Sequence, residues 1–261
     1  MSLTNRYFIE LAYLGTAYHG WQTQPNAIGV QQKIDEALST YFRENVETLG
    51  CGRTDTGVHA SQFYAHFDLQ APFSVEQEQK FLKAVNSLLP YDIAIHHIHS
   101  VAPEAHARFD AVRRSYAYHI HFQKDPFKTQ TSWLIREVLD IDAMNTAASY
   151  ILEYDDFGCF CKANADNFTN ICQVSRSEWE QHESGITYHV TANRFLRNMV
   201  RAIVGTLVDI GKGKMSPEHI KEIIESGSRS NAGPSVPACG LFLTEVYYPY
   251  IHQPSEESTH G

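Results

Sequence analysis

The 261-residue chain lacks the features that mark a secreted or membrane-bound protein. No apolar run is long enough to span a membrane, and the N-terminal segment lacks the basic and apolar regions of a signal peptide. The five cysteines are odd in number and include no CxxC pair, which argues against a disulfide framework or a zinc ribbon. We therefore expect a cytoplasmic protein with reduced thiols and no membrane partner.

The chain also lacks a basic charge surplus, because it carries 21 Lys and Arg residues against 30 Asp and Glu residues. The net charge of −9 argues, on its own, against a nucleic-acid partner. Phosphate groups, however, respond to local patches rather than to the summed charge. Part of the acidic surplus lies in the C-terminal segment HQPSEESTHG, whose composition predicts a flexible tail over residues 251–261. The net charge therefore leaves a nucleic-acid partner open.

Neither a dinucleotide-binding motif nor a P-loop nor a zinc motif is present in the sequence. The 14 histidines include HHIH at 96–99 and HIH at 119–121. Residues two apart on a strand share a face, so each group offers a pair of metal ligands. No acidic or cysteine partner stands nearby at metal-ligand spacing, and we interpret these residues as surface or hydrogen-bonded strand histidines.

Alternating apolar residues predict strands in both halves of the chain. In RYFIELAYLG, one strand face carries Tyr7, Ile9, Leu11 and Tyr13. Further strands are predicted at SQFYAHFDL, DIAIHHIHSV, SYAYHIHF, VSRSEWEQH, ITYHVTANRF and GLFLTEVYY. Helices are predicted at VQQKIDEALSTYF, at SVEQEQKFLKAVNSLLP with a capping box from Ser74 and Gln77, at Asp142–Tyr154, at Leu196–Ile210 with Gly211 as C-cap, and at Ser216–Ser226 with Ser216 and Pro217 as its start.

Alternating rather than continuously apolar strands favour antiparallel sheets covered by helices, which is an α+β fold. We divide the chain into an N-terminal domain over residues 1–110 and a C-terminal domain over residues 111–250, followed by the tail.

The segment GCGRTDTGVHA places one carboxylate, Asp55, among glycines and threonines. An aspartate in such a turn most often hydrogen-bonds its own backbone, which is the simplest interpretation. Arg53 lies two residues away, so in an extended segment both side chains point to the same side. A neighbouring guanidinium keeps a carboxylate ionised, and an ionised carboxylate in a cleft can serve as a nucleophile or a base.

A second segment, NRFLRNMVRAIVGTLVDIGKGK, predicts a helix with one basic face. That face carries Arg194, Arg197, Asn198, Arg201 and Gly205. A basic face can simply be solvated, but solvated faces usually mix charges of both signs. Three arginines without an acid suit phosphates or a carboxylate, because guanidinium groups bind both bidentately. Gly205 leaves room for the close approach of a bulky group.

A third segment, ARFDAVRRSYAYHIHF, places two arginines, Arg113 and Arg114, before a strand that carries Tyr116 and Tyr118. Tyrosines two apart on a strand usually pack within the sheet. The alternative is a platform on which bases stack, next to arginines that bind phosphates.

Together these segments resemble the TruA family of tRNA pseudouridine synthases. Six segments occur in the expected order over about 240 residues, and such agreement outweighs any single motif. They are YLGTAYHGWQTQP, GRTDTGVHA, AHARFDAVRRSYAY, DFGCFCK, FLRNMVRAIVGTLVDIGKG and GLFLTEVYYP. The chain departs from the family at Leu14, where members often carry Asp, and in the poorly matched segment CKANADNFTN.

The resemblance implies a two-domain pseudouridine synthase fold with a cleft between the domains, and a homodimer. It implies isomerisation of uridine to pseudouridine at positions 38, 39 and 40 of tRNA, without cofactor or metal. The family's nucleophile falls on Asp55, and its active-site tyrosine and arginine fall on Tyr116 and Arg201. For the tRNA we expect contacts from Tyr116, Arg53, Arg113, Arg114, Arg194, Arg197, Asn198, Lys212 and Lys214.

Two other classes of protein use some of the same residues. A carbohydrate-active hydrolase would need a second carboxylate paired with Asp55, and none is evident in the sequence. A non-catalytic RNA-binding protein would use the basic helix and Tyr116 equally well, but it has no need of Asp55 beside Arg53. The residues also leave open whether Asp55 attacks C1′, attacks C6 or first removes a proton.

Overall fold

The computed structural model describes residues 5–162 and 168–252. Within these residues the chain forms a sheet of nine strands and five α-helices, joined by loops and short 3₁₀ turns. The strands are β1 (Asn5–Tyr13), β2 (Leu49–Gly50), β3 (His59–Leu69), β4 (Ile93–Ser100), β5 (Arg113–His121), β6 (Trp133–Leu134), β7 (Val174–His182), β8 (Gly185–Ala192) and β9 (Leu241–Tyr247). The helices are α1 (Val30–Phe42), α2 (Glu78–Leu88), α3 (Ile141–Tyr150), α4 (Met199–Gly211) and α5 (His219–Ser226).

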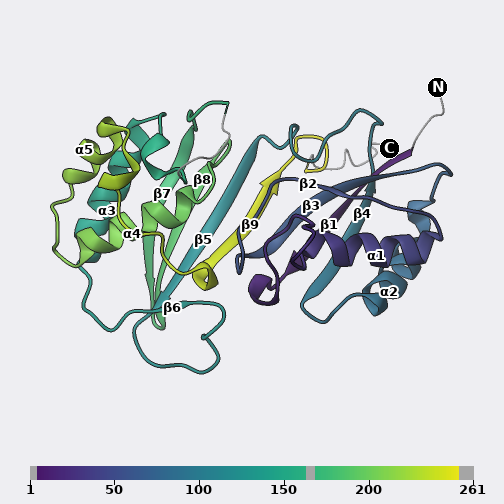
Figure 1. Cartoon of the computed structure of the whole chain (residues 1–261), viewed down its shortest axis with the longest axis horizontal. Helices are drawn as coiled ribbons and strands as arrows, with labels where there is room; N and C mark the ends of the chain where they lie inside the picture. Colours follow the sequence, from purple (N-terminus) through teal and green to yellow (C-terminus); the bar gives the residue numbers. More distant parts are fainter. Residues whose placement is uncertain (1–4, 163–167, 253–261) are drawn as a thin grey trace, which may run out of the picture.

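One sheet runs through both halves of the chain in the order β4-β1-β3-β9-β5-β8-β7, with β2 beside β3 and β6 beside β5. Its neighbouring strands are antiparallel except for the parallel pairs β3·β9 and β5·β6. Helices α1 and α2 lie against the N-terminal half, and α3, α4 and α5 lie against the C-terminal half (Figure 1). The predicted α+β class with mostly antiparallel strands is therefore confirmed.

Two hydrophobic cores lie along this sheet. The N-terminal core is built around buried side chains such as Trp21 and Phe63, and the C-terminal core around side chains such as Tyr188 and Ile203. Strand β9 contributes to both, because Leu241 packs in the C-terminal core while Val246 packs in the N-terminal one. The cores thus follow the two halves of the chain, although the last strand returns to the N-terminal half. The domain boundaries remain a prediction, and residues 253–261 of the expected tail lie outside the described residues.

Local patterns in the sequence account for most elements. The alternating residues of β1 are buried as expected. Phe8 between them is buried as well, because the ring of Tyr248 packs against it with the ring centroids 5.4 Å apart. Helix α1 occupies the predicted segment, with its apolar stripe from Val30 to Leu38 buried. No helix in residues 5–162 and 168–252 is both long and apolar enough to cross a membrane.

Several predicted helix ends are wrong. Ser74 and Gln77 form no side-chain capping box, because Ser74 uses its backbone carbonyl to accept from the Gln77 amide. Gly211 lies inside α4, and the left-handed residue after the helix is Gly213, at φ +70°. Helix α5 begins at His219 rather than at Ser216.

The start of α4 differs most from its prediction. The helix begins at Met199 rather than at Leu196, because Asn198 adopts a left-handed conformation with φ 68°. Arg194, Arg197 and Asn198 therefore precede the helix, and a continuous basic helical face does not form.

Candidate active site

Asp55 lies in the loop that joins β2 to β3, at the point where the chain turns toward β3. The Val58 amide donates a hydrogen bond to the Asp55 carbonyl at 3.1 Å and closes this turn. Exposure alternates along the loop: Arg53 is exposed, Thr54 is buried, and the Asp55 side chain is 29% exposed. The carboxylate is thus within reach of a bound substrate, and the turn is held by backbone atoms rather than by the Asp55 side chain.

The end of β1 and the segment between β1 and α1 form hydrogen bonds with this loop. The Trp21 amide donates to the Thr54 carbonyl at 3.3 Å, and the Tyr13 and Thr54 hydroxyl groups hydrogen-bond at 2.9 Å. Gly20 has φ +86°, and a Cβ atom there would lie 2.2 Å from the Thr54 carbonyl oxygen. A glycine is therefore required where the two segments touch.

His59, the first residue of β3, ties the loop to two other segments. Its Nδ1 accepts a hydrogen bond from the Gly15 amide at 2.9 Å, so its Nε2 carries the proton and donates to the Cys239 carbonyl at 3.1 Å. Burial lowers the pKa of His59, which favours this neutral form. Gly20 and His59 lie within the segments YLGTAYHGWQTQP and GRTDTGVHA, but nothing in the sequence singled out either residue.

Two guanidinium groups face the Asp55 carboxylate. Arg197 Nε lies 3.9 Å from Oδ1, and Arg201 Nη1 lies 3.8 Å from Oδ2. Arg201 is the more fixed of the two, because its side chain is 21% exposed and its Nε donates to the Val236 carbonyl at 2.7 Å. Arg197 is 59% exposed. Both positive charges lie within ion-pair distance of the Asp55 carboxylate and attract it.

Tyr116 lies in β5 and packs against both hydrophobic cores. Its ring meets Phe195 edge to face, with the ring centroids 5.0 Å apart. Burial raises the pKa of the Tyr116 hydroxyl far above its usual value, and the negative charge of Asp55 acts in the same direction. The phenol therefore stays neutral, and its ring forms an apolar surface near the carboxylate.

The sequence of this chain is similar to known proteins along most of its length. Residues 147–249 match the family model described as tRNA pseudouridine synthase. A protein of Bacteroides fragilis named tRNA pseudouridine synthase A is 48% identical over 246 residues, covering 94% of this chain and 96% of the relative. This chain belongs to the tRNA pseudouridine synthase A family.

More distant relatives in this family carry the same name. The protein of Parabacteroides distasonis is 45% identical over 253 residues, covering 97% of this chain and 99% of the relative. The protein of Chlamydia muridarum is 34% identical over 249 residues, covering 95% of this chain and 93% of the relative. The similarity extends over both halves of the chain, including the loop that carries Asp55.

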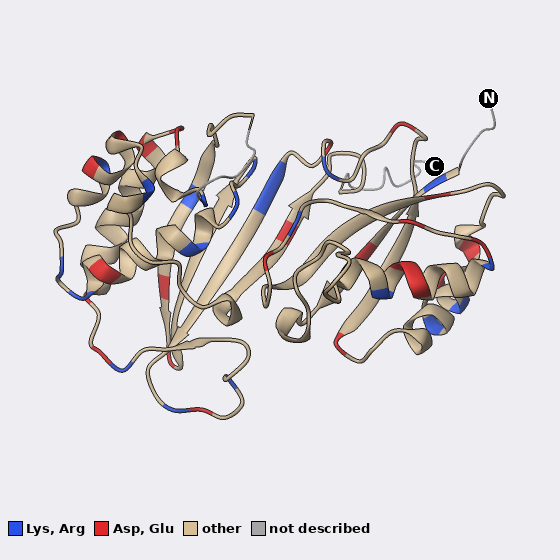
Figure 2. Cartoon of the chain, viewed as in Figure 1, with Lys and Arg blue, Asp and Glu red and all other residues tan. Residues whose placement is uncertain are grey.

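The other cations that the sequence predicted to contact tRNA differ in their exposure and in their ion-pair partners. Arg53 is exposed in the loop, and Arg194 is half-buried near the Cys172 thiol. Arg113 pairs with Glu245 at 3.0 Å, and Lys212 and Lys214 pair with Glu137 and Asp209 at 2.8 and 2.7 Å. Figure 2 shows the basic residues at the start of β5, near the middle of the molecule. Acidic partners thus already neutralise three of the expected cations.

Two residues of the expected basic face, Asn198 and Gly205, contact the segment that precedes β9. Asn198 Nδ2 donates to the Ser235 hydroxyl at 2.7 Å. Gly205 is buried, and a Cβ atom there would lie 1.8 Å from the Pro234 carbonyl oxygen. The bulky group that approaches Gly205 is therefore the backbone of residues 233–236, which the sequence alone did not place beside α4.

The strand histidines differ in their partners: His119 and His121 contact hydroxyl groups, His97 faces a carboxylate, and the buried Nε2 of His99 has no hydrogen-bond partner. His119 Nδ1 lies 2.9 Å from the Thr187 hydroxyl, and His121 Nδ1 lies 2.9 Å from the Ser132 hydroxyl. His97 Nδ1 lies 3.4 Å from a Glu78 carboxylate oxygen. In residues 5–162 and 168–252 no three His, Cys, Asp or Glu side chains come together as a metal site would require.

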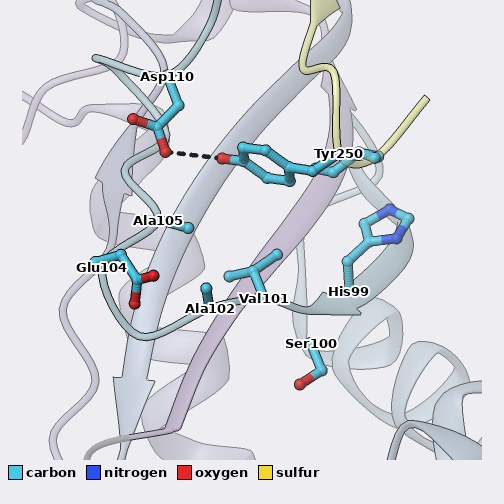
Figure 3. Close-up of a pocket in the computed structure, with 9 residues that line it drawn as sticks. His99, Ser100, Val101, Ala102, Glu104, Ala105, Asp110 and Tyr250 are labelled. Atoms are coloured by element: carbon cyan, nitrogen blue, oxygen red, sulfur yellow. Dashed lines mark hydrogen bonds between the residues drawn. The ribbon is translucent and has the colours of Figure 1, made fainter. Parts of the chain in front are cut away.

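A hollow of about 480 Å³ lies apart from Asp55, at the end of β4 (Figure 3). It is lined by His99, by the loop that follows β4, and by Asp110 and Tyr250. The Tyr250 hydroxyl donates to Asp110 at 3.0 Å, as the dashed line in Figure 3 marks. None of these residues belongs to the expected catalytic set.

Proposed function

We propose that this protein isomerises uridine to pseudouridine at positions 38, 39 and 40 in the anticodon arm of tRNA, with Asp55 as the nucleophile. The observation that carries the proposal is the position of Asp55, partly exposed in the signature loop and faced by Arg197 and Arg201. The reaction class follows from the family, whose enzymes are isomerases.

The chemistry requires one carboxylate and no redox partner. The N1–C1′ bond breaks, the uracil turns, and C5 joins C1′, while C5 loses a proton and N1 gains one. A carboxylate can attack covalently or stabilise a cationic sugar, as in glycoside chemistry. Arg201 supports either role, because its charge and its fixed contact with Val236 hold an ionised Asp55 in place. Attack at C1′, attack at C6 and initial proton removal all fit this arrangement.

A uridine within a stem must leave the base stack before it can react, at a cost of about a few kcal/mol. Tyr116 is suited to receive the flipped base, since its ring is apolar, neutral and close to Asp55. Arg53, exposed in the same loop, is suited to hold the opened strand or its phosphate.

The tRNA is proposed to lie across both subunits of a cytoplasmic homodimer. Arg194, Arg197 and Arg53 are the cations best placed to contact it beside Asp55, with Asn198 at the same helix start. Arg113, Lys212 and Lys214 complete the proposed set, whereas Arg114, also expected there from the sequence, donates to four backbone carbonyls instead. Of these, Arg113, Lys212 and Lys214 would have to exchange a carboxylate partner for a phosphate.

Tritium release tests the proposal. Purified wild type, Asp55→Asn and Asp55→Ala are incubated with tRNA labelled by tritium at uracil C5, without metal or cofactor. We expect the wild type to release tritium to water and both variants to lose at least about 1,000-fold in rate, because they remove the carboxylate that Arg197 and Arg201 face. Asp68→Asn, which removes a surface carboxylate paired with Arg6, serves as the matched control and should keep the wild-type rate.

Other outcomes would identify the rival functions. Tight tRNA binding by the wild type without tritium release would indicate an RNA-binding protein. Release of free uracil would indicate a hydrolase. Full activity of Asp55→Asn would show that the Asp55 carboxylate is not needed for the reaction.

A further inference from the structure

Arg114 makes more hydrogen bonds than any other arginine near the site. Its Nη1 donates to the carbonyls of Ala111 and Asn193, each at 3.0 Å. Its Nη2 donates to the carbonyls of Cys51 and Arg108, at 2.9 and 2.7 Å. The guanidinium group therefore binds four backbone oxygens.

These four carbonyls belong to three separate segments of the chain. Cys51 opens the loop that carries Asp55, and its amide is held on the other side by the Tyr64 carbonyl at 2.8 Å. Arg108 and Ala111 lie in the segment that leads into β5. Asn193 follows β8 and begins the segment that carries Arg197. One guanidinium thus ties together the loop of Asp55 and the segment of its partner Arg197.

Only arginine has the geometry for these contacts. Its planar fork presents several N–H groups in fixed directions, whereas a lysine has a single ammonium group and cannot span all four carbonyls. Arg113, the neighbour on β5, has different contacts: it pairs with Glu245 at 3.0 Å and lies over the Tyr247 ring at 4.7 Å.

We propose that Arg114 is a positioning residue for the reaction. It holds the Asp55 loop and the Arg197 segment at a fixed separation, and thereby sets the distance between the carboxylate and its guanidinium partner. This role differs from the phosphate contact expected from the sequence, because two of its nitrogens already donate to backbone oxygens. The inference rests on the proposed function, since it concerns the position of Asp55 during that reaction.

The test compares Arg114→Lys with Arg176→Lys, a control at an exposed arginine of β7 that pairs with Glu178. Both variants keep the charge and so preserve long-range attraction to RNA. Three quantities are measured: the single-turnover rate at saturating tRNA, the Kd for tRNA, and the dependence of Kd on salt. For Arg114→Lys we expect the rate to fall about 100-fold, as a small displacement of a reacting group would cause. Its Kd should stay within about twofold, with an unchanged salt dependence. Arg176→Lys should resemble the wild type in rate, in Kd and in salt dependence.

Amide hydrogen exchange supplies a readout that needs no RNA. In Arg114→Lys the amides of Cys51, Gly57 and Val58, which all donate hydrogen bonds in or near the loop, should exchange faster than in the wild type. Amides in the distant helices α2 and α5 should be unchanged, which distinguishes a loosened loop from a destabilised fold. Arg114→Gln provides a second variant in case one substitution prevents folding.

Two results would overturn the inference. A weaker Kd in the neutral variant Arg114→Gln, with a salt slope reduced by about 1 and an unchanged rate at saturation, would make Arg114 a phosphate contact. Unchanged rate and exchange would show that the four hydrogen bonds are dispensable. If the wild type itself released no tritium, the proposed function would fail, while faster loop exchange in Arg114→Lys would still establish the clamp.

Discussion

Arginines of this protein differ in role although they look alike in the sequence. Arg201 lies 3.8 Å from the Asp55 carboxylate, Arg113 pairs with Glu245 across neighbouring strands, and Arg114 binds backbone carbonyls. The residue type predicts what an arginine can bind, but its partner depends on which acceptors the fold brings within reach. At this scale the residue type alone does not assign tRNA contacts, because Arg113 and Arg114 already have partners within the protein.

Asp35 provides a prediction about pH. Burial in α1 raises the pKa of Asp35 from 3.8 to about 6, although Thr48 donates two hydrogen bonds to its Oδ1. Because the folded state holds the proton more tightly than the unfolded state, this group costs stability as pH rises from about 4 to 6. Asn retains the acceptor for Thr48 without the charge. Asp35→Asn should therefore raise the free energy of unfolding at pH 7.5 by about 1 kcal/mol, a value reduced for partial exposure to water.

Urea denaturation at pH 7.5 and at pH 4 measures this difference. Near pH 4 the variant and the wild type should agree, since Asp35 is then protonated. Asp68→Asn is a control with an expected effect of the opposite sign. The hydrogen bond from Arg6 lowers the pKa of Asp68, so the ionised carboxylate stabilises the folded state at pH 7.5. Replacing it with a neutral amide should therefore lower the free energy of unfolding at that pH. An equal gain from Asp35→Asn at both pH values would contradict the explanation.

At the scale of single elements, the start of α4 decides where the arginines of the site lie. Asn198 has φ 68°, and its side chain bonds to Ser235 rather than to the end of the helix. Periodicity predicts a helix through this residue because apolar positions continue on both sides of it. The left-handed turn instead separates Arg197 from the helix, and both Arg197 and Arg201 then face Asp55.

Substitutions of Asn198 should separate conformation from hydrogen bonding. Asn198→Gly keeps access to positive φ and loses only the bond to Ser235, so we expect a loss of about 1 kcal/mol in the free energy of unfolding and a rate near wild type. Asn198→Val disfavours this backbone conformation, by about 2 kcal/mol, and should slow single-turnover catalysis at least about tenfold by moving Arg197. Ser235→Ala removes the same bond together with one from Arg229 Nη2 at 3.2 Å, so it should destabilise the protein at least as much as Asn198→Gly and should also keep a rate near wild type. Equal rates in the Gly and Val variants would refute a positional role for the turn.

At the scale of the whole molecule, β9 joins the two halves. It pairs with β3 of the N-terminal half and with β5 of the C-terminal half. Its Val246 is fully buried in the N-terminal core and its Leu241 lies in the C-terminal core. Both ends of the Asp55 loop attach to strands of this shared sheet. The position of Asp55 relative to the C-terminal half therefore depends on the pairing of β9 with β3 and β5.

Val246→Ala should therefore destabilise both halves together, by about 2 kcal/mol. Amide exchange measures the effect: protection should fall in β1 of the N-terminal half and in β8 of the C-terminal half by a similar factor. The reciprocal variant Ile203→Ala, in the C-terminal core, should do the same. Loss of protection confined to the mutated half would instead show that the two halves unfold independently.

The sequence by itself determined the family, the α+β class and most strands and helices, along with Asp55 as the candidate nucleophile. These features are encoded locally, because apolar periodicity specifies backbone conformation and ordered motifs specify a family. Only the tertiary structure decided which partners each charged residue has. Arg201 meets Asp55, Pro234 covers Gly205, and Arg114 joins three segments because residues far apart in the chain become neighbours when β5, β9 and α4 pack together. Contacts of this kind leave no period in the sequence, since they depend on the geometry of the whole fold.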